Sequence, residues 1–257
     1  MRRQLFASVD EASALNGLRH RTINYDPARA PEDGQAEGHW HVDSGETVIG
    51  QEPPGPPVPG GPWETACTLV RQYEFAEPRI LRGVYRAGDE LKGRDMLLEG
   101  RFTVLRFYLG VRVTGIIDET TDAERVWGWS YQTLEGHLEQ GRLTYEVIKD
   151  TATGRVRFRV RGYSRMAPIP SPVVRLGFRL FGRWTQQRFY LRVQRRMRDL
   201  VQAAQRGDPL PVPAVRPDGL VLAPSGTAPH PLERLARSWL HPGRAAPQRV
   251  APLPFGS

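Results

Sequence analysis

The chain has 257 residues, of which 39% are hydrophobic and 25% are charged, as is typical of a soluble globular protein. No apolar run approaches the ~18–20 residues that a membrane-spanning helix needs, and the first residues lack the apolar segment of a secretory signal. The single cysteine, Cys67, excludes a disulfide framework within the chain and a cysteine-based zinc motif. We therefore expect a cytoplasmic protein.

The formal net charge is +8 and the isoelectric point is about 10.1. A basic balance favours nucleic acid, an anionic membrane or acidic ligands as partners. However, only Lys92 and Lys149 are lysines, and every other basic residue is arginine. This skew is typical of codon usage in a GC-rich genome, so the net charge alone does not lead us to predict a nucleic-acid partner.

Residues 1–61 are interpreted as an N-terminal extension that ends in a proline-rich linker. The linker, QEPPGPPVPGGP at residues 51–62, has six prolines and is expected to be extended and polyproline-like. Before it, GHWHVD places His39, His41 and Asp43 at alternate positions, where a strand would point them the same way as metal ligands. This pattern is weak beside a linker, so we assign no metal and no cofactor.

Residues 62–205 are predicted to form one folded domain. A helix is expected over residues 62–75, because proline suits its first turn and Ala66, Leu69 and Tyr73 lie on one apolar stripe. Strand-like runs follow at short spacing, at residues 79–86, 96–107, 109–118, 125–133, 142–149 and 155–163.

The last element of the domain is a long helix, predicted to begin at Pro172 and to end near Ala204. Its mostly apolar stripe consists of Val174, Phe178, Phe181, Thr185, Phe189, Val193, Met197 and Leu200. Consecutive strands predict an antiparallel sheet, and a helix with such a stripe must lie across one face of it. The predicted fold is α+β, with a curved antiparallel sheet of about six strands packed on a long C-terminal helix.

Residues 206–257 are rich in proline and lack apolar periodicity, so we expect a mostly disordered tail. One exception is PLERLARSWL at residues 231–240, where Leu232, Leu235 and Trp239 fall on one helical face. A short docking helix and chance amphipathicity both explain this pattern.

The sequence also predicts the register of one hairpin, whose turn lies around residues 150–154. The inward-facing pairs are Tyr145–Phe158, Leu143–Val160 and Val147–Val156. The same register places Glu146 opposite Arg157 on the outer face. That face then presents a row formed by Arg155, Arg157, Arg159 and Arg161. The row is either the solvated face of a half-buried strand or a grip for an anion.

Five aromatic residues are expected to share the interior of the sheet. Trp127, Trp129 and Tyr131 lie on one face of the preceding strand and are expected to face the same side as Tyr145 and Phe158. Core packing is the simpler interpretation of these residues. Lining of a ligand cavity is the more specific one.

Several stretches of the domain resemble a known family. The main ones are YEFAEPRILRGVYR, GRDMLLEGRF, RVWGWSYQTLEGHLEQGRLTYEV and RGYSRMAPIPSPVVRLGFRLFGR. They are similar to a bacterial and plant group known as domain of unknown function nineteen-ninety, over residues 62–197, and TLEGHLEQG is the most specific part. The resemblance implies a START-like helix-grip fold, in which a curved antiparallel sheet wraps a long C-terminal helix and often encloses an apolar cavity. The family brings no established reaction, ligand or catalytic residue.

His137 lies between Glu135 and Glu139 in the glycine-bracketed TLEGHLEQG segment. A carboxylate beside a histidine orients the imidazole, so His137 and Glu139 are candidates for an acid–base pair. A turn in which both residues satisfy backbone groups is the simpler explanation. Because no partner nucleophile is visible, we assign no catalytic residue.

The predicted terminal helix is rich in arginine, opposed only by Asp199. The arginines are Arg175, Arg179, Arg183, Arg188, Arg192, Arg195, Arg196 and Arg198. Sheet-edge carboxylates such as Glu99 or Glu119 are their simplest partners, and an anionic head group or RNA phosphate are the others.

The sequence alone specifies no reaction. Our first hypothesis is a non-catalytic module that binds a small, largely apolar ligand between the sheet and the terminal helix. The ligand-binding residues would be Trp127, Trp129, Tyr131, Tyr145 and Phe158, with His137 and Glu139 at the mouth. The alternatives are an enzyme that uses His137 and Glu139 as acid and base, and a protein that binds RNA or an anionic surface through the arginine-rich helix.

Overall fold

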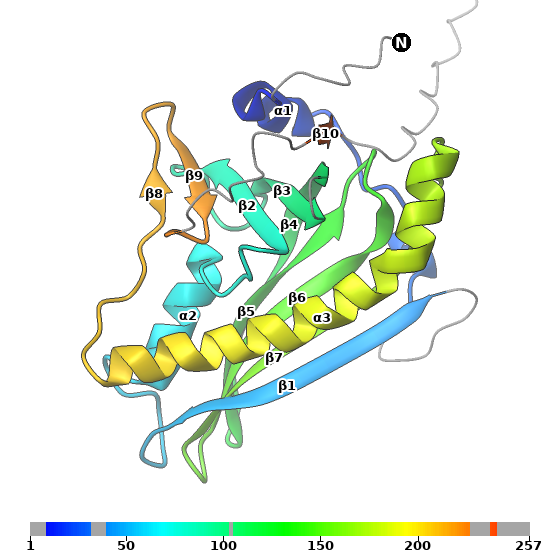
Figure 1. The fold of residues 1–257 in the computed structure, drawn as a ribbon. Coiled ribbons are helices and arrows are strands. Elements are labelled where there is room, and N and C mark those ends of the chain that lie inside the picture. The colour runs from blue at the N-terminus through cyan, green and yellow to red at the C-terminus, as the bar shows by residue number, and fades with distance from the viewer. Residues whose placement is uncertain (1–8, 32–39, 103–104, 227–236, 241–257) are drawn as a thin grey trace, which may run out of the picture.

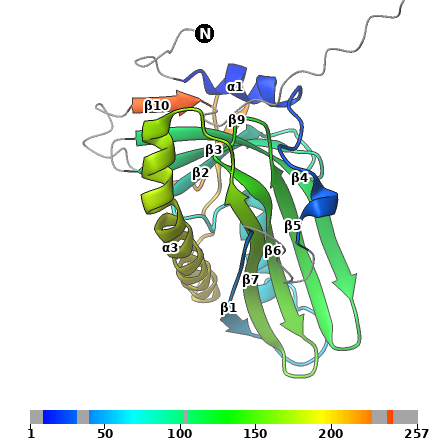
Figure 2. The same cartoon turned by 90° about the vertical axis from the view of Figure 1, so that its right-hand side faces the viewer.

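The computed structural model describes residues 9–31, 40–102, 105–226 and 237–240. Within these residues the chain forms an α+β fold, in which one large curved antiparallel sheet lies against a long C-terminal helix, as predicted (Figure 1). Figure 2 shows that the sheet bends strongly and that the helix, α3, lies inside the bend. None of the helices in the described residues is both long and apolar enough to cross a membrane.

The sheet has more strands than the sequence predicted. The strands are β1 (His41–Gln51), β2 (Leu81–Arg86), β3 (Asp95–Phe102), β4 (Leu105–Thr120), β5 (Glu124–Thr133), β6 (Glu139–Asp150), β7 (Arg155–Met166), β8 (Ala214–Val215), β9 (Leu220–Ala223) and β10 (Arg237–Leu240). Among the described residues, nine of them follow the order β1-β7-β6-β5-β4-β3-β2-β9-β8, all antiparallel, and β10 pairs in parallel with β4. The expectation of about six strands was therefore wrong.

The unpredicted strands come from both sides of the predicted domain. Strand β1 belongs to the N-terminal extension and pairs with β7 at one edge of the sheet. Strands β8 and β9 belong to the predicted tail, and β9 pairs with β2 near the other edge. The division of the chain into an extension, a domain and a tail stays a prediction, although the sheet draws strands from all three.

The predicted helices are confirmed. The helical elements are α1 (Glu11–Leu18), the short η1 (Pro27–Arg29), α2 (Pro62–Gln72) and α3 (Pro172–Gln205). Helix α2 begins with its proline, as expected, and ends at Tyr73, which adopts a left-handed conformation with φ 63° and donates its N–H to the carbonyls of Leu69 and Val70. Within the stripe predicted for α3, Phe189, Val193 and Met197 are buried.

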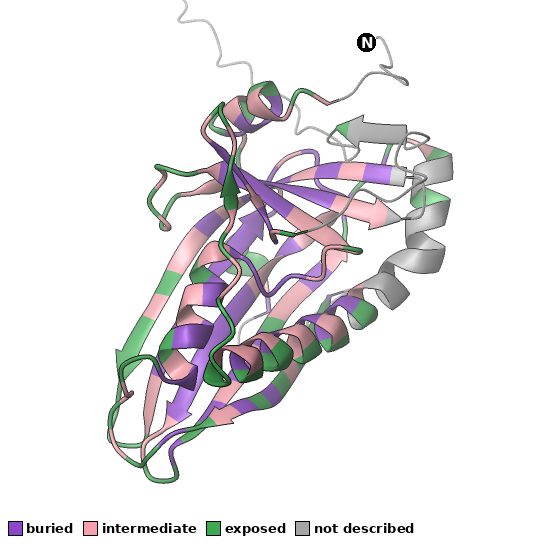
Figure 3. Ribbon diagram, turned by 60° about the vertical axis from the view of Figure 1, so that its left-hand side comes forward, coloured by how far each residue is buried: buried purple, intermediate pink, exposed green. Residues whose placement is uncertain are grey.

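Two apolar clusters lie on opposite faces of the sheet. Figure 3 shows the buried residues that run along its strands. On the inner face, side chains from β4–β7 meet those of α2 and α3. On the outer face, Leu15 and Leu18 of α1 cover side chains of β2, β3 and β4. Strand β2 serves both clusters, because Tyr85 faces the inner one and its neighbour Val84 the outer one.

The register of β6 with β7 differs from the predicted one by two residues. Tyr145 pairs with Val160, and Val147 pairs with Phe158. A shift by two keeps every side chain on its face, so the inward-facing residues were assigned to the correct side. The register was wrong because the charged Lys149 continues the inner row, where it pairs with Val156.

Three of the four arginines in the outer row, Arg157, Arg159 and Arg161, pair with carboxylates. Glu146 lies opposite Arg159, not Arg157. Its Oε2 accepts from Arg159 Nε at 2.8 Å and from Arg161 Nε at 3.0 Å. Arg157 Nη1 donates to Glu46 at 2.8 Å. These contacts support the interpretation as the solvated face of a half-buried strand.

Two predicted element boundaries were also wrong. The sequence placed a break between strands near Tyr108, but β4 continues through Tyr108, which pairs with Glu99 of β3. The apolar run at residues 105–112 is compatible with two strands or with one continuous strand, and it contains no turn-forming residue before Gly110. Helix α2 ends at Gln72, whereas the sequence placed its end at residue 75. Residues 237–240, where a docking helix and chance amphipathicity were both open, form β10, and residues 231–236 lie outside the described residues.

A buried ion pair holds the proline-rich segment against the sheet. Lys149 Nζ lies 2.7 Å from Glu52 Oε2, and both side chains are fully buried. Lys149 also donates to the carbonyl of Pro56 at 2.7 Å, and Glu52 Oε1 accepts from the N–H of Trp63 at 2.8 Å. The segment is thus hydrogen-bonded to β6 and to the start of α2.

Candidate functional site

The five aromatic residues predicted to share an interior do so. Trp127, Trp129 and Tyr131 of β5 lie with Tyr145 of β6 and Phe158 of β7 in the inner apolar cluster, and all are buried. The ring centroids of Trp129 and Tyr145 are 5.2 Å apart with planes at 68°, an edge-to-face contact. Most of this aromatic layer therefore packs on itself.

Two aromatic residues at the end of α2 complete the layer. The ring of Phe75 lies 4.6 Å from that of Tyr145 and 5.3 Å from that of Phe158, measured between centroids. The ring of Tyr73 lies 5.2 Å from that of Phe75. The sequence placed both residues in the helix. The left-handed turn at Tyr73, which aims them at the sheet, has no sequence signal such as glycine.

The hydroxyl groups of three of these tyrosines meet inside the aromatic layer. Tyr73 Oη lies 3.5 Å from Tyr145 Oη, and the Tyr145 side chain also bonds that of Tyr131. Burial raises the pKa of Tyr131 and of Tyr145 well above the ordinary value. The three hydroxyls are therefore neutral, and each has one proton to donate and two lone pairs to accept with.

Helix α3 brings a fourth tyrosine to this place. Tyr190 is buried in the same cluster and lies close enough to Tyr131 to influence its pKa. Its neighbour Phe189 is also buried, and their rings meet edge to face at 6.4 Å. We name Tyr73, Tyr131, Tyr145 and Tyr190 the tyrosine cluster. It joins α2, the middle of the sheet and α3.

His137 lies in the loop between β5 and β6, and it closes this loop by a hydrogen bond to Glu139, the first residue of β6. The N–H of Glu139 donates to His137 Nδ1 at 2.9 Å, which makes Nδ1 an acceptor and places the imidazole proton on the other nitrogen. The loop is held against the N-terminal segment, where the N–H of Glu135 donates to the carbonyl of Thr22 at 3.0 Å. This is the turn in which the residues satisfy backbone groups, and it does not favour the acid–base alternative.

Burial lowers the pKa of His137 from its ordinary 6.5 to about 4. The imidazole is therefore neutral and fixed at neutral pH. General acid–base catalysis is most efficient when the pKa of the catalytic group is close to the working pH. With so low a pKa, His137 would be a weak proton acceptor near pH 7.

Lowering the pH should destabilise the protein through His137. In the unfolded chain the imidazole gains a proton below about pH 6.5, whereas in the folded protein it stays neutral down to about pH 4. The free energy of unfolding therefore falls as the pH is lowered from about 6.5 to about 4, by up to about 1.4 kcal/mol per pH unit. We expect the wild type to lose about 1 kcal/mol more than His137→Asn between pH 6 and pH 5, in urea unfolding. Asparagine keeps an acceptor for the N–H of Glu139.

The matched control for this pH experiment is His20→Asn, because His20 is exposed at the end of α1. This variant should show the pH dependence of the wild type. Parallel curves for the wild type and His137→Asn would contradict the burial of a neutral imidazole.

The arginine-rich helix makes part of its contacts within the fold. Arg196 Nε donates to the carbonyl of Glu74 at 3.0 Å, and Arg198 Nε donates to the carbonyl of Val48 at 3.2 Å. The predicted carboxylate partner Glu99 lies elsewhere, among arginines of β2, β3 and β4. Binding of RNA or an anionic surface through this helix is not favoured by these contacts.

The alternate histidines before the linker do not form a described metal site. His41 is exposed at the start of β1, Asp43 is half-buried, and His39 lies outside the described residues. Where residues are described, no group of three or more His, Cys, Asp or Glu side chains is arranged to hold a metal ion. Cys67 is half-buried and not bonded to another cysteine.

The fold and its aromatic interior define an α+β protein with one sheet, a structural loop between β5 and β6, and a tyrosine cluster on the inner face of the sheet. A family model described as "Domain of unknown function (DUF1990)" matches residues 24–196. The chain belongs to this family, as its sequence motifs indicated. A comparison with curated proteins gives no match.

Three solved structures that resemble this chain have low TM-scores. Ara h 8.0201 aligns with a TM-score of 0.36 and 12% identity, over 64% of this chain and 99% of that one. Major latex-like protein 151 of Panax ginseng gives 0.38 and 12%, over 63% and 97%. A norcoclaurine synthase point mutant of Thalictrum, solved with a transition-state analogue, gives 0.35 and 10%, over 64% and 98%. At these scores we transfer nothing from them to this chain.

Proposed function

We propose that the protein is a non-catalytic module that binds a small, largely apolar ligand between the inner face of the sheet and α3. The ligand meets the tyrosine cluster with one hydrogen-bonding group and the aromatic layer with its apolar part. A cytoplasmic location, expected from the sequence, belongs to this proposal.

The observation that carries the proposal is the tyrosine cluster itself. Buried hydroxyl groups normally find full hydrogen-bond partners, because an unmet polar group in the interior is costly. Here Tyr73 and Tyr145 bond each other at 3.5 Å, the long limit for a hydrogen bond. A ligand oxygen or nitrogen beside these hydroxyls would add a shorter hydrogen bond to this network.

The apolar part of the site follows from the surrounding side chains. Trp127, Trp129 and Phe158 provide aromatic surface on the sheet, and Phe189 provides it on α3. Such walls with a few convergent polar groups are typical of small-molecule sites. His137 and Glu139, predicted at the mouth, hold the loop that follows β5, and we propose for them a supporting role in place of a direct contact.

Native mass spectrometry of the full chain, purified without denaturation, tests the proposal. We expect the wild type to carry a co-purified small molecule and Tyr131→Phe to carry it at roughly two- to tenfold lower affinity, since one neutral hydrogen bond is lost. The control is Tyr25→Phe, whose hydroxyl bonds Gln132 Nε2 at 2.8 Å in a separate aromatic group. A wild type with no bound small molecule, or equal losses in both variants, would count against it.

A further inference from the structure

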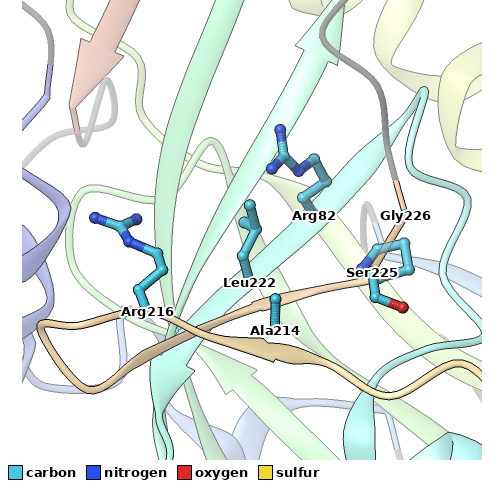
Figure 4. Close-up of a pocket in the computed structure, with 7 residues that line it drawn as sticks. Arg82, Ala214, Arg216, Leu222, Ser225 and Gly226 are labelled. Atoms are coloured by element: carbon cyan, nitrogen blue, oxygen red, sulfur yellow. The ribbon is translucent and has the colours of Figure 1, made fainter.

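A pocket opens near the β2–β9–β8 edge of the sheet and has a volume of about 460 Å³ (Figure 4). Its lining includes Arg82, Ala214, Arg216, Leu222 and the turn at residues 224–226. Nothing in the ligand site proposed above involves these residues.

The pocket lies on the outer face of the sheet, opposite the tyrosine cluster. Arg82 shares a face of β2 with Val84, which belongs to the outer apolar cluster under α1. Leu222 lies directly across from Val84, and Ala214 lies across from Leu222, so both share that face. The sheet therefore separates the two sites.

Arg82 is one of the two basic side chains that line the pocket. Its Nη1 lies 3.4 Å from Glu99 Oε2, a long ion pair, and its Nε is buried with no hydrogen-bond partner in the structure. Glu99 also lies 3.3 Å from the Nε atoms of both Arg101 and Arg106. One buried carboxylate is thus shared by three guanidinium groups, one of which belongs to Arg82.

The other arginine of the pocket is already matched. Arg216 Nη2 lies 2.9 Å from Asp218 Oδ2, and Nη1 pairs with Glu11 of α1. These two carboxylates neutralise Arg216 and hold it as a wall of the pocket. An incoming anion would therefore find its partner in Arg82.

The turn on the remaining side is fixed by a buried carboxylate. The N–H of Ser225 donates to Glu74 Oε1 at 2.9 Å, and Ser225 Oγ donates to Glu74 Oε2 at 3.0 Å. Glu74 directly follows Tyr73 at the end of α2 and is itself buried. The pocket wall at residues 224–226 is therefore anchored to the core before any ligand binds, which favours binding.

We propose that this pocket binds a small molecule with one carboxylate or phosphate group on a short apolar body. The anionic group bonds the guanidinium of Arg82, which is a charge-assisted contact. The apolar body packs on Leu222, Ala214 and Pro224. This inference is independent of the proposed interior site.

Backbone amide NMR of the full chain tests the pocket with benzoate, phenyl phosphate and uncharged benzyl alcohol. We expect saturable shifts at the amides of Leu222, Ser225 and Gly226 with at least one anion and not with the alcohol. Which anion binds more tightly identifies the anionic group. Arg82→Gln should weaken the binding by about tenfold or more, because it removes the charge. Arg86→Gln is the control, since Arg86 lies on the same face of β2 and bonds Asn16 instead.

A second variant guards against a structural effect of the first. Leu222→Trp keeps every charge but fills the pocket, so it should abolish the anion-induced shifts while the other amide signals stay in place. The inference is overturned if neither anion gives saturable shifts, if benzyl alcohol binds as tightly as the anions, or if Arg82→Gln binds like the wild type.

Discussion

Replacing Lys149 with methionine should lower the free energy of unfolding by about 3–5 kcal/mol, because it leaves Glu52 charged and buried without its partner. Both side chains are fully buried, so water cannot take the place of the ammonium group. The carbonyl of Pro56 would lose its donor as well. Urea unfolding followed by far-UV circular dichroism measures the loss.

The chain offers a close control for this change. Lys92 is the only other lysine, and it is exposed in the connection between β2 and β3. Lys92→Met should change the free energy of unfolding by no more than about 0.5 kcal/mol. If Lys149→Met costs less than about 1 kcal/mol, the ion pair is not the attachment that the structure shows.

Phe75→Ala should cost about 3–5 kcal/mol, because it opens a cavity between α2 and the aromatic layer. The ring of Phe75 is fully buried and lies within 5.3 Å of the rings of Tyr73, Tyr145 and Phe158, centroid to centroid. Its neighbours are themselves large and packed from the other side, which limits their collapse into the space. The loss is measured by the same urea unfolding.

An exposed apolar residue provides the comparison for Phe75. Leu191 lies on α3 with 70% of its surface exposed. Leu191→Ala should therefore leave the stability within about 0.5 kcal/mol of the wild type. A loss below about 1.5 kcal/mol for Phe75→Ala would mean that the interior is looser than described and already holds space at this position.

Much of the fold could be predicted from the alternation of apolar and polar residues in the strands and from the residues that begin the helices. The helix that begins at Pro172 and the strands from residue 79 to 163 carry strong patterns, and they were placed within a few residues. Strand β1 was missed because it is an edge strand in which few residues besides Thr47 and Ile49 are buried, so its sequence shows little apolar alternation. Strand β9 has only four residues, too short for a period to show.

The candidate site was predicted only in part, because its remaining members depend on contacts between distant residues. That the aromatic residues of β5, β6 and β7 share the inner face follows from the two-residue period of side chains in a strand. The position of Tyr73 depends on a left-handed turn that no glycine announces. Lys149 pairs with Glu52, 97 residues away along the chain, and local patterns carry no sign of such a partner. The predicted inner row held apolar residues alone and did not include Lys149, which pairs with Val156 in the structure.

The most direct test of the interior site is a crystal structure of the full chain purified without denaturation. We predict non-protein electron density between the inner face of the sheet and α3, within hydrogen-bond distance of the Tyr131 or Tyr145 hydroxyl. An inner face filled only by the protein's own side chains, with those hydroxyls bonded to one another alone, would contradict the proposed function.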